Sequence, residues 1–266
     1  MPDLKLRMTY DSIASLYEKG RPSYPDNIID LIIEFSELKS GQNILDIGCG
    51  TGKGILPFLK RGYSAFCIDI GEQMISEAKS MLADFKNVNF EVVKFEDWHT
   101  NQKFSLIICA SAFHWLEYNK RYLKIAELLN NEGTLAIIKQ DSVLEKNEFF
   151  YQQEKIYRKH IPEWFESTQI ELSKINKLNE SGLNLYTLPI KEIFSWKKEY
   201  SATEYINLLR TYSGHINLPS EKREKVLNDI TKLITNDFNG YTSLKWKTEL
   251  VLRKKYQDHV SQVEVK

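Results

Sequence analysis

The sequence has few cysteines, no excess of charge of either sign and no long apolar run. Its three cysteines, Cys49, Cys67 and Cys109, are too few and too scattered for a disulfide framework or a zinc site. Lysine plus arginine and aspartate plus glutamate both number 36, so no net charge draws the protein onto a nucleic acid or an anionic membrane. We therefore expect no metal, no nucleic acid partner, and a reducing, cytoplasmic location that suits thiols in apolar segments.

Membrane and targeting signals are lacking as well. The N-terminal stretch MPDLKLRMTY has no apolar region of the signal-peptide kind, and no run of about 18 apolar residues occurs. Only seven prolines and 12 glycines are present, without a proline-rich linker or an internal repeat. With 42 % apolar residues the chain can bury a core of its own, so we expect one structural domain that needs no membrane.

Short apolar, β-branched runs alternate with amphipathic stretches from about 28 to 139. This rhythm is typical of repeated βα units and predicts a parallel sheet. Apolar residues at spacings of three and four mark the helices between the strands. The predicted strands are 43–47, 64–69, 89–94, 104–109 and 133–139, and the predicted helices are 27–37, 53–61, 71–84 and 118–130.

The pattern changes after residue 140. Charged, aromatic-rich segments follow, which indicate a helical lid, and two late strand-like runs then predict completion of the sheet by the C-terminal segment. These runs lie at about 190–200 and 243–256, with helices near 202–211 and 220–236. We expect an α/β fold with a Rossmann-like, mostly parallel seven-stranded sheet, helices on both faces and a helical lid. Its parts are 1–140 (N-terminal helices and core), 141–189 (lid) and 190–266 (sheet completion and pocket).

Glycines and acidic residues follow the first two predicted strands. Residues 48–52 read G-x-G-x-G, and glycines there let the backbone approach a ligand at the carboxyl end of a strand. A dinucleotide fingerprint requires glycine at position 53, where this chain has Lys53. Asp69 follows Gly50 by 19 residues, the separation expected for a carboxylate that binds a ribose. Asp46, before the glycines, would repel a pyrophosphate but suits a ligand with an ammonium and a sulfonium, such as S-adenosylmethionine.

These motifs resemble those of class I S-adenosylmethionine-dependent methyltransferases, within them the small-molecule group typified by trans-aconitate methyltransferase. The resemblance covers 8–139 most strongly, and YDSIASLYEKGRPSYP (10–25) and LLRTYSGHINLP (208–219) extend it over most of the chain. Its core segments are ILDIGCGTGKG (44–54), CIDIGEQMISEAK (67–79), FEDW (95–98), FSLIICASAFHWL (104–116) and LLNNEGTLAII (128–138).

The resemblance implies a cofactor site for S-adenosylmethionine, with S-adenosylhomocysteine as product and no metal. Asp69 would bind the ribose, Phe95 would face the adenine, and Glu96 or Asp97 would accept a hydrogen bond from its amine. The methionine part would lie at the glycine turn, and Tyr17 would cover the cofactor or staple its helix to the core. The remaining implied contacts are Asp46, Gly48, Cys49 and Gly50 at the methionine, Ile70 and Met74 at the adenine, and Ala110 and Ser111 at the sulfonium.

Candidate acceptor contacts lie in aromatic and basic segments. His114 is the candidate catalytic residue, needed as a base only if the acceptor is a hydroxyl or an amine, because a carboxylate is already ionised at pH 7. The Arg210 guanidinium could bind an acceptor carboxylate bidentately, or it could satisfy the carbonyl groups at a helix end. His114 could equally pack under the lid. The full set of candidates is Tyr10, Arg21, His114, Trp115, Arg210, Tyr212 and His215.

These observations favour a methyltransferase that acts on a small, carboxylate-bearing molecule by direct in-line transfer, as a monomer or homodimer. Positioning supplies most of the catalysis in such a reaction, because the methyl group of the cofactor is already activated. Two alternatives stay open at this point: methylation of RNA or protein, and a catalytically idle protein that binds S-adenosylmethionine to regulate a partner.

Overall fold

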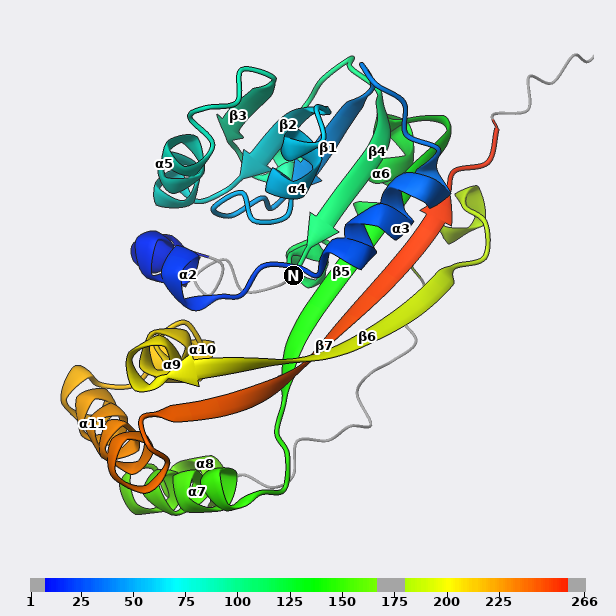
Figure 1. Ribbon diagram of the computed structural model, residues 1–266. Coiled ribbons are helices and arrows are strands. Elements are labelled where there is room, and N and C mark those ends of the chain that lie inside the picture. The colour runs from blue at the N-terminus through cyan, green and yellow to red at the C-terminus, as the bar shows by residue number, and fades with distance from the viewer. Residues whose placement is uncertain (1–7, 167–179, 258–266) are drawn as a thin grey trace, which may run out of the picture.

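The computed structural model describes residues 8–166 and 180–257, which form an α/β fold around one seven-stranded sheet (Figure 1). The strand order is β3-β2-β1-β4-β5-β7-β6. The expected fold class is therefore confirmed, including the two late strands that complete the sheet. The strands are β1 (Asn43–Ile47), β2 (Ser64–Asp69), β3 (Val88–Val92), β4 (Phe104–Ala110), β5 (Leu129–Val143), β6 (Ile190–Ser201) and β7 (Tyr241–Lys254).

The sheet is mixed, because β7 runs antiparallel to both of its neighbours, β5 and β6. The strands from β1 to β5 pair in parallel. After β1 the chain forms β2 and then β3 on one side of β1, and it then crosses over to form β4 and β5 on the other side. In open parallel sheets such a reversal of strand order leaves a crevice at the carboxyl ends of the central strands, where ligands bind.

Helices cover both faces of the parallel part, as alternate residues of each strand point to opposite sides. On one face Ile44 and Ile108 pack with α3 and α4, and on the other Leu45 and Ile107 pack with α6. No described helix is both long and apolar enough to cross a membrane. The helices of this part are α2 (Ala14–Gly20), α3 (Asp26–Ser36), α4 (Leu56–Lys60), α5 (Glu72–Met81) and α6 (Arg121–Leu128), with single 3₁₀ turns η1 (Asp11–Ile13), η2 (Phe95–Asp97) and η3 (Phe113–Trp115).

Strands β5, β6 and β7 continue past the parallel part and carry a second layer of helices (Figure 1). Phe149, Tyr205, Ile230 and Trp246 belong to a separate buried cluster there. The lid thus draws on helices from beyond the predicted range 141–189, of which 167–179 lie outside the described residues. Its elements are α7 (Glu148–His160), α8 (Glu163–Glu166), α9 (Ala202–Leu209), α10 (Ser213–Ile216) and α11 (Ser220–Asp237), and the turn η5 (Leu183–Leu185) precedes β6.

The short helix α2 joins the two layers, since it packs on α5 of the parallel part and on α9 of the lid. Its last residue is Gly20, where an added Cβ would lie 2.8 Å from the carbonyl oxygen of Asn207 on α9. Glycine is therefore needed for this close approach. On the other side, the Glu18 carboxylate accepts hydrogen bonds from the Thr51 hydroxyl and from Lys53 Nζ, the latter at 2.7 Å. Helix α2 thus ties the glycine turn to the lid.

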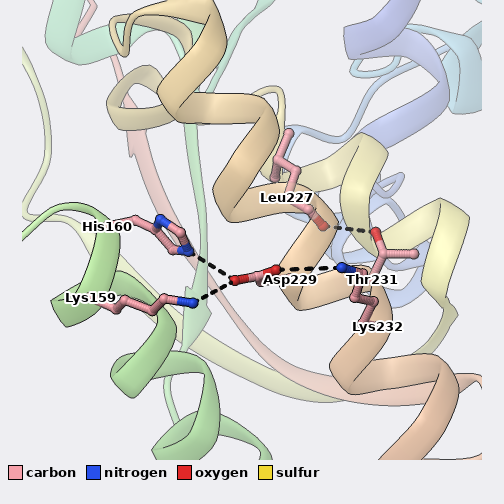
Figure 2. A network of polar contacts seen from close by, with 6 residues as sticks. All are labelled: Lys159, His160, Leu227, Asp229, Thr231 and Lys232. Atoms are coloured by element: carbon pink, nitrogen blue, oxygen red, sulfur yellow. Dashed lines mark hydrogen bonds and ion pairs between the residues drawn. The ribbon is translucent and has the colours of Figure 1, made fainter.

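Besides its buried cluster, the lid has a polar contact that joins α7 and α11 (Figure 2). The Asp229 carboxylate on α11 lies 2.9 Å from His160 Nε2 and 3.3 Å from Lys159 Nζ, both at the end of α7. Lys232 Nζ approaches the same carboxylate at 3.9 Å. The His160 hydrogen bond, followed by the Lys159 contacts, holds the pKa of Asp229 below its ordinary value.

We expect Asp229→Ala to lower the free energy of unfolding by about 0.5–1 kcal/mol, because these side chains are partly exposed and water screens them. The Asp229 pKa is lowered on folding, so the loss is present at neutral pH and disappears as pH falls through that pKa. Urea unfolding at pH 7 and pH 3 measures it. Glu221→Ala is the matched control, because within residues 8–166 and 180–257 Glu221 forms an ion pair only with Lys225 of its own helix. Equal losses in both variants would contradict a role for Asp229 in joining the helices.

Candidate functional site

A cavity of about 340 Å³ lies at the carboxyl ends of β1, β2, β4 and β5, between α2 and the lid. This is the crevice that the strand order predicts. Most of the residues singled out from the sequence meet there, although they come from segments far apart in the chain. The predicted residues that line the cavity are Tyr10, Tyr17, Arg21, Gly48, Cys49, Gly50, Asp69, Ile70, Met74, Phe95, Ala110, Ser111, His114, Trp115 and Tyr212.

The glycine turn forms one wall. The backbone N–H groups of Gly48 and Cys49 both donate to the Ile68 carbonyl, at 2.8 and 3.1 Å, which fixes the turn against the end of β2. Gly48 has a φ of 68°, and a Cβ there would lie 2.5 Å from the Ala112 Cβ. Gly50 has a φ of 55° but faces open space. The first glycine is thus required by packing and the second by backbone conformation.

Asp69 joins the ends of the first two strands. One carboxylate oxygen accepts a hydrogen bond from the Gly50 N–H at 2.9 Å, and the other accepts from the Gly71 N–H at 2.8 Å. A carboxylate offers about four lone-pair positions, so both oxygens can also accept bonds from a ligand hydroxyl pair. The geometry is compatible with the ribose contact expected of this residue.

Asp46 carries a buried carboxyl group behind the turn. It is 1 % exposed, and neither oxygen has a hydrogen-bond partner among the described residues. Burial, and secondly the negative charge of Asp69, raise the pKa of Asp46 to about 8. Asp46 does not itself line the cavity, but Oδ2 lies 3.4 Å from the position of a Cβ built on Gly54, which does. A cationic group bound at the turn would pair with this carboxyl. S-adenosylmethionine carries such a group, its ammonium.

The N-terminal segment covers the cavity. Asp11 accepts hydrogen bonds from the N–H groups of Gln73 and Met74, at 2.7 and 3.0 Å, at the start of α5. Tyr24 donates to the Ser111 hydroxyl oxygen at 3.1 Å. Sequence reasoning missed both contacts, and the earlier contact of Glu18 with the turn, because each joins segments more than 30 residues apart and no local pattern marks them.

Arg21 lies where the cavity meets the lid. Its guanidinium carbon is 4.4 Å from the ring centroid of Tyr212 and 5.7 Å from that of Tyr17. One guanidinium nitrogen donates to the Thr211 carbonyl at 3.0 Å, and Nε has no partner in the described part of the chain. No carboxylate of residues 8–166 or 180–257 forms an ion pair with it.

Arg210 and His215 require corrections. Arg210 lies outside the cavity, because both of its terminal nitrogens pair with the Glu224 carboxylate on α11, at 2.6 and 2.5 Å. This pairing raises the Arg210 pKa and leaves the acceptor-binding interpretation without support. The position of Arg210 at the C-cap of α9 agrees with the helix-end interpretation. His215 is buried in the lid and lines a different cavity.

The predicted adenine contacts are also corrected in part. Phe95 lines the cavity, but Glu96 and Asp97 do not. The Glu96 side chain accepts a hydrogen bond from the N–H of Glu117, 21 residues further along the chain, at 3.0 Å. The structure thus brings Phe95, but not the two acidic residues, to the wall of the cavity.

The end of β5 adds residues that the sequence analysis omitted. Lys139, Gln140 and Asp141 line the cavity opposite α2, and Lys139 pairs with Asp141 at 2.7 Å. Strand ends at this edge of the sheet form ligand sites, so these residues could have been singled out from the sequence. They were omitted because the strand was predicted to end at 139, whereas it runs to Val143. His114 is exposed at the same wall, and partial desolvation followed by the charge of Lys139 lowers its pKa.

Comparison with known proteins places this geometry in a family. Residues 38–205 match the model of a methyltransferase domain. An uncharacterized methyltransferase of Mycobacterium bovis is 24 % identical over 135 residues, 50 % of this chain and 52 % of that protein, so the chain spans about half the length of such relatives. The malonyl-[acyl-carrier protein] O-methyltransferase of Acetivibrio thermocellus is 28 % identical over 84 % of this chain and 79 % of that protein.

Solved structures agree on the fold. The phosphoethanolamine N-methyltransferase 2 of Haemonchus contortus, solved with phosphomonomethylethanolamine and S-adenosylhomocysteine, aligns with a TM-score of 0.54 at 13 % identity, over 96 % of this chain and 61 % of that one. The family model covers well over half of the sequence, and the buried carboxyl and glycine turn fit the cofactor. The chain therefore belongs to the methyltransferase domain family.

Proposed function

We propose that the enzyme transfers a methyl group to a carboxylate oxygen of a small-molecule acceptor and that Arg21 holds this carboxylate. The observation that supports it is the Arg21 guanidinium, which lines the cofactor cavity without a carboxylate partner among the described residues. A planar guanidinium matches the geometry of a carboxylate and binds it through paired hydrogen bonds. The name of the Acetivibrio relative, an O-methyltransferase of a malonyl group, is in keeping with this chemistry.

The cofactor would be held by residues from four segments. Asp46 would face its ammonium, Asp69 its ribose hydroxyls and Phe95 its adenine, with Ile70 and Met74 beside the ring. The N–H groups of the glycine turn would donate hydrogen bonds to its carboxylate. S-adenosylmethionine, when bound, supplies a methyl group on a positively charged sulfur, which leaves as neutral S-adenosylhomocysteine once the acceptor oxygen has bonded to the methyl carbon.

The remaining work of the chain is to position the acceptor and exclude water. A carboxylate has about four lone-pair positions, so hydrogen bonds to Arg21 leave others directed at the methyl group. An aromatic cover is formed by Tyr10, Tyr17 and Trp115. The ring centroid of Tyr10 lies 6.1 Å from that of Tyr17 and 6.3 Å from that of Trp115. Aromatic faces near a positive sulfur contribute about 0.5–2 kcal/mol of attraction.

His114 would serve as a base only for an acceptor that must lose a proton. Its lowered pKa keeps the imidazole neutral at pH 7, the form that accepts a proton. With a carboxylate acceptor this capacity is not needed, and His114 would then contribute only to the shape of the wall.

Asp46→Asn should stabilise the ligand-free enzyme at alkaline pH and weaken cofactor binding. The Asp46 pKa is raised from 3.8 to about 8, so the folded protein binds more protons than the unfolded chain in this window and loses stability as pH rises through it. The advantage of the variant should grow by at most about 1.4 kcal/mol per pH unit and level off above pH 8. Urea unfolding from pH 5 to pH 9 measures this, and parallel curves for both proteins would contradict it. Calorimetry at pH 8 should show S-adenosylhomocysteine binding weakened roughly 10- to 150-fold.

Arg21→Gln should raise the acceptor KM by roughly 10- to 150-fold, the scale of hydrogen bonds to a charged group, with little change in the KM for S-adenosylmethionine. The assay is methyl transfer to a panel of small mono- and dicarboxylic acids. Arg210→Gln is the matched control, because it also removes a guanidinium, but one that is paired with Glu224 outside the cavity. Equal KM changes in the two variants, or turnover of amines and alcohols but no acid, would refute the carboxylate assignment.

His114→Gln should reduce kcat for a carboxylic acid less than tenfold and leave kcat independent of pH between 6 and 9 at saturating substrates. General bases contribute about 10²–10⁴-fold, so a loss of that size would identify His114 as a base. The pH dependence of kcat in the wild-type enzyme gives the second readout. A limb that rises with pH near the histidine pKa and is absent in the variant would mean that the acceptor is a hydroxyl or an amine.

A further inference from the structure

A second and larger cavity, of about 1010 Å³, lies in the lid beside the cofactor cavity. Small-molecule sites in proteins have volumes of about 300–1,000 Å³ and are mostly apolar, so this cavity is large enough for a ligand by itself. Helices α7, α8, α9 and α10 and the end of β5 surround it. Apolar and aromatic side chains dominate its wall, among them Leu144, Tyr151, Tyr157, Trp164, Leu209 and Leu244.

The two cavities adjoin at Tyr212, which lines both. Directly after Tyr212 the chain passes from one cavity to the other, since Ser213 lines the first and Gly214 the second. The Tyr212 hydroxyl donates to Ser142 Oγ at 2.9 Å, and the Arg21 guanidinium lies over the same ring at 4.4 Å. The residue proposed to bind the acceptor carboxylate therefore contacts the side chain that separates the cavities.

Large apolar side chains are exposed at the second cavity. Leu144 is 75 % exposed, Tyr151 58 % and Trp164 40 %, although all three line it. Exposed apolar side chains that gather at one place mark a ligand or partner surface rather than ordinary surface scatter. The cavity thus presents apolar surface that an apolar ligand would remove from water.

We propose that the second cavity binds the apolar tail of the acceptor, and that the acceptor is a carboxylic acid with an extended hydrocarbon tail. The proposal rests on the proposed function, because it places the carboxylate head at Arg21. The tail would pass Tyr212 into the lid, where Trp164 and Tyr151 contact it. The enzyme would thus select acceptors by tail length as well as by charge.

The test uses straight-chain acids from butanoate to dodecanoate, titrated into the enzyme saturated with S-adenosylhomocysteine. Each added methylene that enters the cavity should improve affinity by about fourfold until the cavity is filled. Gly214→Leu should flatten this dependence, because a Cβ at Gly214 already lies 3.3 Å from the Trp164 ring and a larger side chain projects into the cavity. Trp164→Ala, which removes a partly exposed ring, should also reduce the gain per methylene. Binding of S-adenosylhomocysteine by each variant verifies that it is folded.

Leu188→Trp is the control, since Leu188 is 86 % exposed and lines neither cavity, and it should keep the wild-type dependence on chain length. Affinity independent of chain length, or Gly214→Leu and Leu188→Trp with the same slope, would overturn the proposal. If Arg21→Gln still weakens short acids in that case, the carboxylate assignment stands and only the tail site fails. If Arg21→Gln has no effect, the proposed function itself fails.

Discussion

The pairing of β7 along its whole length with β5 and β6 is the constraint on which the rest of the molecule depends. Its register runs from Thr134 opposite Lys254 to Val143 opposite Lys245 on one side, and β6 pairs with the same strand on the other. Backbone hydrogen bonds therefore continue from the parallel sheet into the lid without a hinge between them. The cofactor cavity and the lid cavity thus lie along one continuous sheet, and Tyr212, which lines both, is hydrogen-bonded to Ser142 on β5.

The N-terminal segment closes what the sheet leaves open. Glu18 binds the glycine turn, Asp11 accepts from the start of α5, and Arg21 reaches the lid at Thr211. The three contacts lie within one stretch of 11 residues, so the segment contacts the turn, a helix of the parallel part and the lid together. Because Gly20 allows α2 to lie against α9, the cover is packed as well as hydrogen-bonded. Movement of this segment would change the cofactor wall and the acceptor wall together.

The features that could be predicted from the sequence are those fixed by short segments. The glycine turn and the distance from Gly50 to Asp69 follow from one strand, one turn and the next strand, and the structure has them as expected. Strand positions in the parallel part agree within a few residues for the same reason. The ends of the long strands were less predictable, because cross-strand pairing with β7 extends β5 to Val143 beyond its own apolar run.

The candidate residues whose role could not be predicted are those whose position depends on pairing with residues far away in the sequence. Arg210 was a reasonable candidate by chemistry and position, but Glu224 on α11 takes both of its terminal nitrogens. Arg21 has the same functional group and lines the cavity because its own segment folds over the turn. Which of two arginines meets the cavity depends on where the acidic residues of other helices lie, and a single sequence does not reveal this.

Charge also explains why an anchor such as Arg21 would act on binding more than on rate. In the proposed reaction a positive sulfur and a negative carboxylate become a neutral thioether and a neutral ester, so both charges fade as the transition state is reached. A guanidinium paired with the carboxylate stabilises the ground state more than the transition state, which lowers KM without raising kcat. Acceleration must then come from alignment and from exclusion of water, because water solvates the full charges of the ground state more strongly than the fading charges of the transition state. In the proposed reaction the aromatic cover of Tyr10, Tyr17 and Trp115 would serve both tasks. The catalytic contribution would then come from the packing of the N-terminal segment against η3 rather than from a single ionisable group.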